Sequence, residues 1–184
     1  MFELFLEKLK EDKDHWNHIQ DSFIDREIAS KTILLEEGEI SKQIHFVKSG
    51  CLRQCFNKDG KDITFQFFFE NQAVASFDSF MNSQPSIFSI EALEPTVISS
   101  ISKEDFDKLM DSIPKFKDAM FNLTVSRFRV YTHLFLSRIK DSPQERYKDL
   151  VQNRPDIIQR IPQHYIASYL GITPISLSRI RNRK

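Results

Sequence analysis

The chain has few of the residues that cross-link or interrupt a fold: its 184 residues include only two cysteines and four glycines. Cys51 and Cys55 cannot supply the four thiolates of an ordinary iron–sulfur cluster. We predict that both lie on one strand, where four residues span about 13 Å, too far for a disulfide between them. The expected state is therefore a pair of buried, reduced thiols.

Long apolar runs are also missing, and none approaches the roughly 20 residues that a membrane-spanning helix needs. The N-terminal segment, MFELFLEKLKEDKD, is acidic and amphipathic, unlike a secretory signal. These two observations predict a cytoplasmic protein with no membrane partner.

Signatures of catalysis are lacking as well. The chain contains no P-loop, nucleophile elbow or dinucleotide fingerprint. Of its histidines, only His45 lies in the β-rich region, so the multi-histidine metal site of a cupin enzyme cannot form there. His15 and His18 have helical spacing but no third ligand. We predict a protein that is not an enzyme, with no catalytic residue, metal site or cofactor.

The net charge is zero, but the charge is unevenly distributed. From Arg138 to Lys184 there are 10 basic and 4 acidic residues, whereas the rest of the chain has 16 basic and 22 acidic residues. An acidic body with a basic C-terminal end is typical of a protein that binds a polyanion at one end.

The period of the apolar residues divides the chain into regions. Residues 1–30 are predicted to be helical, from Phe2, Phe5, Leu6 and Leu9 followed by Trp16, Ile19, Phe23 and Ile28. Residues 31–102 are predicted to form short strands, namely KTILLEEGE, IHFVKSG, CLRQCFN, DITFQFFF, FSIEAL and TVISSI. Gly38, Gly50 and Gly60 mark turns, and Asn57-Lys58-Asp59-Gly60 is typical of a hairpin loop. Many short strands with regular turns indicate a sandwich or barrel.

Helical spacing returns after residue 102. Ser102 is predicted to cap a helix that starts at Lys103, and Pro114 to open a longer helix that extends to Lys140. The longer helix carries an apolar stripe at Phe116, Met120, Leu123, Arg127, Val130, Leu134 and Phe135. The stripe would pack on the β-region or pair with a second copy, and we favour a homodimer. Replacing Leu123 and Val130 by glutamate would then give monomers.

A helix-turn-helix is predicted from Gln163 to Arg183, after a helix that runs from Pro143 to about Gln152. Ala167 is the small residue where two helices cross, and Gly171 lies in the turn. The core-facing set is Ile166, Leu170, Ile172, Leu177 and Ile180. Thr173-Pro174 is a helix start, and the candidate DNA-binding residues are Gln163, Thr173, Pro174, Ile175, Ser176, Ser178, Arg179 and Asn182. An amphipathic helical hairpin without DNA is the alternative.

This order of elements resembles the Crp/Fnr family of bacterial transcription regulators. The matching residues are Phe46-Val47-Lys48-Ser49-Gly50, Ile166-Ala167-Ser168-Tyr169-Leu170-Gly171-Ile172-Thr173-Pro174 and Leu177-Ser178-Arg179-Ile180. The resemblance implies an α+β protein with an N-terminal β-roll or jelly roll, flanking helices, a long dimerisation helix (about 114–140) and a C-terminal winged-helix-like helix-turn-helix. The domains would be a cyclic-nucleotide-binding-like sensor, 1–141, and a DNA-binding domain, 142–184. The implied partners are double-stranded DNA, a second copy, RNA polymerase and an effector of unknown identity.

The candidate effector pocket departs from the cyclic-AMP-binding members. The family's pocket matches Val74 to Ile90, and its candidate residues here are Ala75, Ser76, Ser86 and Ile87. Those members carry a glutamate for the ribose and an arginine for the phosphate, where this chain has Ser76 and Ser86. A phosphate without a cation would be left uncompensated, so we expect no cyclic AMP binding. Ser76, Ser79, Ser83 and Ser86 would bind a neutral ligand or act as capping hydroxyls.

The DNA-facing helix also departs from well-known members, because Pro174 and Ile175 replace an arginine and a glutamate, whereas Arg179 matches a family arginine. We therefore expect a different DNA sequence, and no wing after the second helix. A ligand-sensing or protein-interaction module with a decayed DNA-binding unit remains the alternative function, and salt-dependent DNA binding would separate the two.

Overall fold

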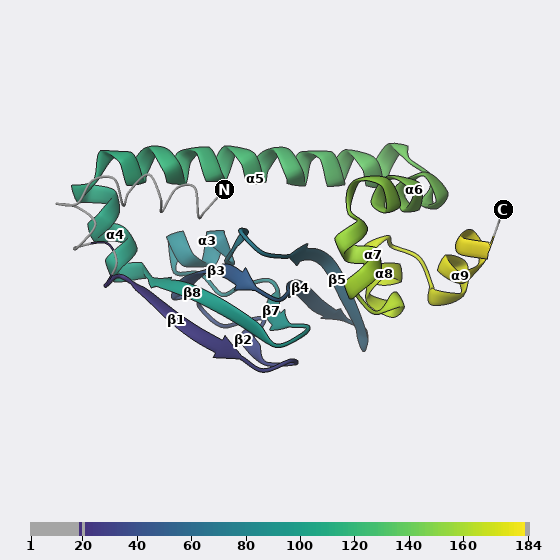
Figure 1. The fold of residues 1–184 in the computed structure, drawn as a ribbon, viewed down its shortest axis with the longest axis horizontal. Coiled ribbons are helices and arrows are strands. Elements are labelled where there is room, and N and C mark those ends of the chain that lie inside the picture. The colour runs from purple at the N-terminus through teal and green to yellow at the C-terminus, as the bar shows by residue number, and fades with distance from the viewer. Residues whose placement is uncertain (1–18, 20, 183–184) are drawn as a thin grey trace. The chain divides into compact units, whose positions relative to one another are not determined.

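The computed structural model describes Ile19 and residues 21–182 (Figure 1). The chain forms two compact units. The first comprises the described part of Met1–Gln54 together with Phe67–Leu123, and the second comprises Cys55–Gln66 and the described part of Thr124–Lys184. The division into a sensor domain, 1–141, and a DNA-binding domain, 142–184, rests on the sequence alone and stays a prediction. None of the described helices is long and apolar enough to cross a bilayer.

The β-region folds into two four-stranded sheets, in the orders β1-β8-β3-β6 and β2-β7-β4-β5. Their strands are β1 (Phe23–Ile28), β2 (Ile33–Leu35), β3 (Gln43–Ser49), β4 (Leu52–Lys58), β5 (Lys61–Phe68), β6 (Ala73–Val74), β7 (Ser89–Ala92) and β8 (Thr96–Ser102). All six predicted strand segments contain a strand. In the first unit, Val47 and Ile98 of one sheet pack with Leu52 and Ile90 of the other, which makes an apolar core between two layers.

The first described strand corrects one prediction. Residues 1–30 are predicted to be helical, but Phe23–Ile28 forms β1, which pairs antiparallel with β8 from Phe23↔Ile101 to Ile28↔Thr96. The ladder of hydrogen bonds with β8 overrides the weak helical spacing of Phe23 and Ile28, because an edge strand needs few buried side chains. The rest of the predicted segment, residues 1–18 and 20, lies outside the described residues.

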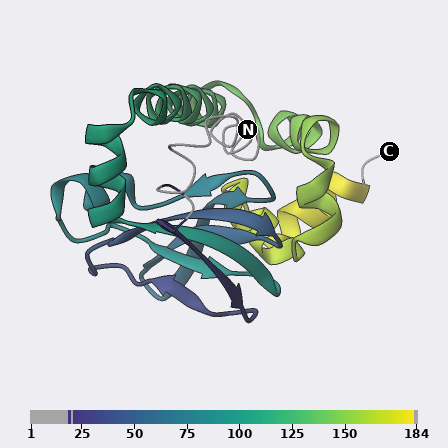
Figure 2. The same ribbon diagram turned by 60° about the vertical axis from the view of Figure 1, so that its left-hand side comes forward.

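A second apolar cluster joins the sandwich to the helices that follow it. α4 (Lys103–Ser112) begins where β8 ends and leads into α5 (Pro114–Lys140), as both ribbon views show (Figures 1 and 2). Phe106 of α4 makes edge-to-face contacts with Phe80 and Phe116, at ring-centroid distances of 5.2 Å and 5.7 Å. Such pairs add to the burial of the rings themselves. The start of α5 is therefore fixed on the first unit.

Most local signals in the sequence are confirmed. The loop between β4 and β5 is Asp59-Gly60, with φ of 53° and 78°, as a two-residue hairpin turn of this kind requires. The Ser102 side chain accepts a hydrogen bond from the Asp105 N–H at the start of α4. Cys51 and Cys55 are both free and buried, as predicted.

Alanine substitutions at Gly50 and Gly60 test how closely the turn at Gly50 is packed in the sandwich. The φ of Gly50 is +96°, and an added Cβ would lie 2.4 Å from Thr96 Oγ1 and 2.7 Å from the Pro95 carbonyl oxygen. Gly60 has a similar φ but no atom within 4 Å of that position. We expect Gly60→Ala to lower the free energy of unfolding by about 1 kcal/mol, because alanine is strained at a positive φ. Gly50→Ala should lower it by about 3 kcal/mol or more, because its Cβ would in addition overlap with backbone atoms. Urea denaturation monitored by circular dichroism measures both, and equal losses would contradict this account.

The apolar stripe predicted on α5 faces the protein rather than solvent. Phe116 and Met120 are buried, and Leu123 packs against the same cluster of the first unit. Arg127 and Leu134, further along, are half-buried in the second unit. This stripe therefore packs on the protein's own core, which was the alternative to pairing. Val130 and Phe135 are the exceptions, because both are exposed, and Phe135 belongs to a second stripe.

The second stripe lies on the outward side of α5. Its members are separated by three or four residues and are Phe121, Val125, Phe128, Thr132, Phe135 and Ile139. The three phenylalanines have between 64% and 72% of their surface exposed, and Ile139 has 67%. A contiguous apolar surface that is exposed along several turns of a helix marks an interaction site in most proteins. We refer to these six residues as the outward stripe.

Four short helices complete the second unit: α6 (Pro143–Asn153), α7 (Pro155–Arg160), α8 (Gln163–Tyr169) and α9 (Pro174–Asn182). A capping box between Ser142 and Glu145 starts α6, as the Ser-Pro-Gln-Glu sequence favours. Pro155 ends the extension of α6 and opens α7, since proline suits the first helical position. The core of this unit includes Leu150, Ile157, Ile161 and Ile166.

Candidate functional site

The C-terminal pair of helices has the packing that its sequence predicts. Ala167 in α8 is fully buried, and Ile166 and Leu170 are 3% exposed. The turn after α8 passes through Gly171, with φ of +69°, a conformation that glycine adopts at little cost. Leu177 of α9 is 1% exposed. The two helices thus share one apolar seam, which positions the outer face of α9.

The start of α9 is capped by Thr173. Its hydroxyl accepts a hydrogen bond from the Ser176 N–H at 3.2 Å, which satisfies one of the free donors of the first turn. The hydroxyls of Thr173 and Ser176 are also hydrogen-bonded to each other at 3.0 Å. Ser176 is half-buried. These two residues therefore define the beginning of the helix, and their hydroxyls are already engaged.

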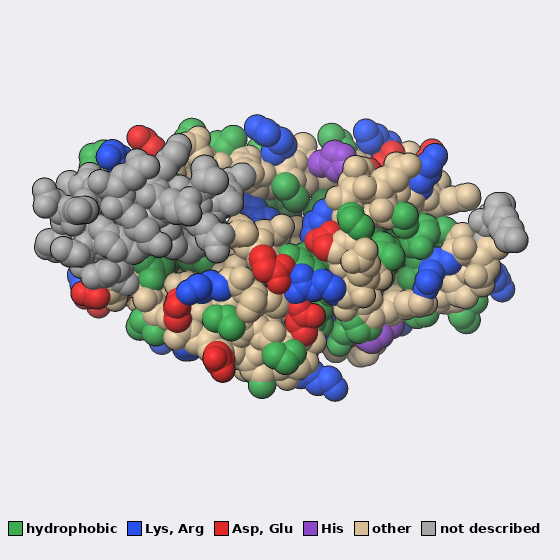
Figure 3. Space-filling model, viewed as in Figure 1, with side chains coloured by type: hydrophobic (Ala, Val, Ile, Leu, Met, Phe, Trp, Pro, Cys, Tyr) green, Lys and Arg blue, Asp and Glu red, His purple; other side chains and the backbone are tan. Residues whose placement is uncertain are grey.

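The remaining candidate residues are exposed. On α9 they are Pro174, Ile175, Ser178, Arg179 and Asn182, and Gln163 is exposed at the first position of α8. Arg181 is exposed too, but it also lines a small cavity of about 60 Å³ with Tyr147, Ile158 and Gln163. Arg179 and Arg181 thus differ in their surroundings although they lie two residues apart. Figure 3 shows Lys and Arg side chains around the C-terminal helices on the face in view.

Two arginines hold the end of α8. Arg138 Nη2 donates to the Tyr169 carbonyl at 2.7 Å, and Arg146 Nη2 donates to the Leu170 carbonyl at 2.9 Å. The last carbonyls of a helix lack partners within it, and cations at this end interact favourably with its dipole. Sequence reasoning missed both roles, because the donors precede their acceptors by 31 and 24 residues.

A third attachment fixes α8 within the second unit. The Ser168 hydroxyl accepts a hydrogen bond from the Thr64 N–H at 2.8 Å and donates to the Asp62 carbonyl at 3.4 Å. Asp62 and Thr64 belong to β5, just after the Asp59-Gly60 turn. The β4–β5 hairpin tip and α8 are therefore parts of one compact unit, so the helix pair has a defined orientation relative to this hairpin.

The candidate effector pocket contains two serines that satisfy each other. Ser76 precedes α3 (Phe77–Asn82), Ser86 follows it, and each is 3% exposed. Their hydroxyl oxygens are hydrogen-bonded at 2.9 Å, and Ser86 Oγ also donates to the Phe88 carbonyl at 2.6 Å. The positions where cyclic-AMP-binding members of the family that the sequence resembles carry an acid and a base hold a neutral, closed pair of hydroxyls here.

The neighbouring members of that pocket are engaged or point elsewhere. The Ala75 carbonyl accepts a hydrogen bond from Gln54 Nε2 at 3.1 Å, and Ser79 Oγ accepts from the Ser41 N–H at 2.9 Å. Ile87 is 79% exposed. The structure therefore favours structural roles for these serines over ligation.

Two basic residues on the strands of the first unit, Lys48 and Arg53, are paired with acids. Arg53, 4% exposed, bonds Glu91 of β7, with Nε 2.7 Å from Oε2. Lys48 bonds Asp25 at 2.6 Å, and this bond lowers the pKa of the aspartate. A buried ion pair is costly to separate, because each charge would be left without its partner. Neither residue is available to neutralise a bound phosphate. Among the described residues no three His, Cys, Asp or Glu side chains are placed to hold a metal ion.

We expect no measurable binding of cyclic AMP or cyclic GMP by the protein in isothermal titration calorimetry at micromolar concentrations. The cyclic phosphate would displace the Ser76–Ser86 hydrogen bond without gaining a cation, and a buried, unpaired charge is strongly unfavourable. Saturable binding of either nucleotide at micromolar concentration would contradict this interpretation of the pocket.

Comparison with known proteins supports the β-roll and the order of the elements. Residues 25–112 match the family described as the cyclic nucleotide-binding domain. No curated protein sequence matches the chain significantly.

Solved structures of bacterial regulators have the same fold. They include FixK2 from Bradyrhizobium japonicum (TM-score 0.73, 15% identity, 86% of this chain and 82% of that chain). A structure described as a transcriptional regulator of the Crp/Fnr family from Eubacterium rectale has a TM-score of 0.71 at 21% identity, over 91% and 80% of the two chains. A CooA variant from Carboxydothermus hydrogenoformans has a TM-score of 0.70 at 19% identity, over 90% and 77%. At these identities the likeness shows the fold alone.

Proposed function

We propose that the chain is a sequence-specific DNA-binding transcription regulator of the Crp/Fnr type, which acts as a homodimer and does not respond to cyclic AMP. The observation that carries the proposal is the geometry of α9. Leu177 anchors one side of this helix, Thr173 caps its start, and polar and basic residues cover its exposed side. An α-helix of this kind fits the major groove of B-DNA and presents its first turns to the base edges.

The residues on α9 suit different contacts with DNA. Arg179 is placed to bind a guanine edge or a phosphate. Ile175, 68% exposed in the first turn, is placed to contact a thymine methyl group. Gln163 at the exposed start of α8 suits a contact with the phosphate backbone, where helix N-termini commonly bind. The excess of basic residues from Arg138 onward supplies the sequence-independent attraction.

The outward stripe supports a dimer. A monomer would leave three phenylalanines and Ile139 facing water along one side of α5. Two copies of α5 packed about a two-fold axis would bury these side chains against each other, as knobs and holes at three- and four-residue spacing allow. A symmetric dimer would then present two copies of α9 to two half-sites one helical turn apart.

Other assignments follow from the same proposal. Residues 1–141 would act as the sensor and residues 142–184 as the DNA-binding domain, with the β4–β5 hairpin bound to α8 by Ser168. RNA polymerase is a further expected partner, since regulators of this type act on transcription. Cyclic AMP is not expected to act as an effector.

Selection of bound DNA from a random pool tests the proposal directly. A dimer that reads DNA with two α9 helices should enrich a two-fold symmetric sequence, with half-sites about 10 base pairs apart. Binding of the enriched sequence should weaken steeply with salt, because phosphate contacts release counterions. If no sequence is enriched and no salt-dependent binding occurs, a ligand-sensing or protein-interaction module becomes the better description.

A further inference from the structure

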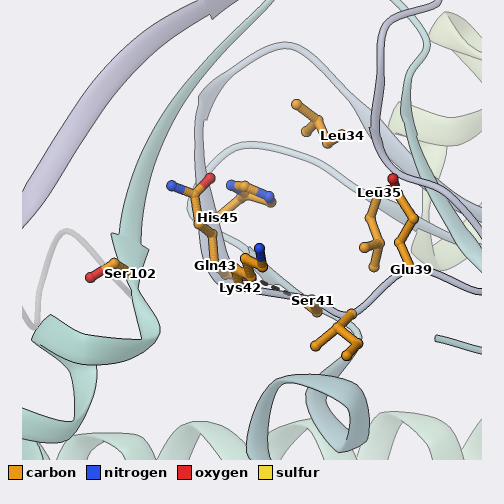
Figure 4. Close-up of a pocket in the computed structure, with 9 residues that line it drawn as sticks. Leu34, Leu35, Glu39, Ser41, Lys42, Gln43, His45 and Ser102 are labelled. Atoms are coloured by element: carbon orange, nitrogen blue, oxygen red, sulfur yellow. Dashed lines mark hydrogen bonds between the residues drawn. The ribbon is translucent and has the colours of Figure 1, made fainter. Parts of the chain in front are cut away.

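A second pocket lies in the first unit and shares neither Ser76 nor Ser86 with the candidate effector pocket, although the Ser86 N–H donates to the carbonyl of Glu39 in its wall. It has a volume of about 630 Å³ and is formed by β2, the loop after it, and the start of β3. Figure 4 shows His45, Gln43 and Lys42 on one side of this pocket, with Leu35 and Glu39 across from them. Leu34, Ile40, Ser41 and Ser102 complete the lining. Pockets of this size accommodate small organic ligands.

His45 gives the pocket a polar ring, one nitrogen of which is bonded within the protein. Its side chain is 4% exposed, and its Nδ1 is hydrogen-bonded to Ser100 Oγ at 2.8 Å. Within the described part of the chain, Nε2 has no hydrogen-bonding partner. This nitrogen is not among the fully buried atoms without a partner, and His45 lines the pocket. It is therefore accessible to a group bound there.

The Ser100 hydroxyl determines which nitrogen of His45 carries the proton. Ser100 is 1% exposed, and His45 is the only partner of its hydroxyl within residues 21–182. If Nδ1–H donated to this hydroxyl, the serine proton would be buried without an acceptor, which is costly. The hydroxyl therefore donates to Nδ1, and the ring proton is on Nε2. His45 thus offers a buried N–H donor to the pocket.

Charge around this donor favours an anionic acceptor. Lys42 is exposed at the same wall, and Arg26 Nη2 donates to Gln43 Oε1 at 2.9 Å, which leaves the Gln43 amide NH₂ as a further donor. Burial, and to a lesser extent the charge of Arg26, lowers the pKa of His45 to about 4. The ring is neutral at pH 7. A bound anion would therefore face the donors of His45 and Gln43 and the charge of Lys42, and His45 would not need to take up a proton. Glu39 across the pocket disfavours a second anionic group.

We propose that this pocket binds a small amphipathic monocarboxylate, whose carboxylate accepts hydrogen bonds from His45 Nε2–H and Gln43 and pairs with Lys42. Its apolar body lies against Leu34, Leu35 and Ile40. Dicarboxylates are disfavoured because their far end meets Glu39. The site does not depend on DNA binding by α9, and either can hold if the other fails.

Hexanoate, 1-hexanol and adipate test this assignment as probes, with binding measured by NMR titration of the full-length protein. Hexanoate should give saturable shifts of the His45 ring and of the leucine methyl groups, and it should bind at least about five-fold more tightly than 1-hexanol or adipate, because hydrogen bonds to a charged group are the stronger ones. Absence of saturable hexanoate binding, or equal affinity for the alcohol, would overturn the proposal.

Variants locate the site. His45→Phe should weaken hexanoate binding at least about ten-fold by removing the buried donor. Should that variant fail to fold, Lys42→Gln decides the matter, since this side chain is exposed, and it should weaken binding two- to five-fold. Lys48→Gln, the same charge change on β3 outside the pocket, is the matched control and should leave hexanoate affinity unchanged. Equal affinities of the Lys42 and Lys48 variants would exclude this pocket.

Discussion

Replacing Phe121, Phe128 and Phe135 together by glutamate should convert a homodimer into a monomer. These side chains lie on the outward stripe of α5, where each is more than 60% exposed, so the change should leave the folded chain intact. Across a two-fold axis the three glutamates would face their own copies, and buried like charges strongly oppose association. Sedimentation velocity at micromolar concentration measures the change.

Loss of the dimer should also lower the affinity for DNA. A monomer presents one α9 to one half-site, so the triple variant should bind the selected sequence at least about 100-fold more weakly than the parent protein. A matched control with Asn122→Glu and Arg129→Glu, two exposed positions of α5 outside the outward stripe, should remain dimeric. A parent protein that is monomeric at micromolar concentration would refute the role of α5 in pairing.

Of the two residues that the sequence suggests for such a test, Val130 is exposed, whereas Leu123 is unsuitable for a physical reason. Leu123 packs on the apolar cluster of the first unit, so Leu123→Glu would bury a charge in the protein's own core. It would lower the stability of the fold and would not report on pairing. A three-four spacing shows that a helix has an apolar side, but it does not show which surface covers that side.

The strands, their turns and the helix starts could be predicted because their signals are local. Asp59-Gly60 selects a tight turn, Ser102 caps α4, and Pro114 and Pro143 stand at the first positions of helices. β1 could not be predicted as a strand, because its pairing with β8 joins residues about 70 positions apart. Strand pairing of this range leaves almost no local pattern in the edge strand.

Some properties of the candidate sites could likewise be predicted from the sequence, whereas others depend on contacts between distant residues. The identities of Ser76 and Ser86 were enough to predict that the pocket does not bind cyclic AMP, since both charged side chains that such a ligand needs are absent. Their hydrogen bond to each other depends on the loop geometry and could not be read from spacing. The donor of His45 was missed because Ser100, the partner of its Nδ1, lies 55 residues away. Only the structure shows that the ring lines a pocket.

Arg179→Ala should weaken binding of the selected DNA sequence by roughly ten- to hundred-fold, since a contact to a guanine edge or a phosphate contributes about 1–3 kcal/mol. Arg179 is exposed in the second turn of α9, and Leu177 holds the helix from its opposite side, so the variant should fold normally. Thermal unfolding checks the fold, and fluorescence anisotropy at fixed salt measures the affinity.

Arg181→Ala provides the matched control, because it removes the same charge from the same helix. Arg181 lines the cavity beside Tyr147 and Ile158, so its replacement should lower DNA affinity only several-fold, and equally for the selected and random sequences. Arg179→Ala should lose affinity mainly for the selected sequence if it reads a base, and equally for both sequences, with a flatter salt slope, if it holds a phosphate. If Arg179→Ala binds the selected sequence as tightly as the parent protein, α9 is not the helix that enters the groove.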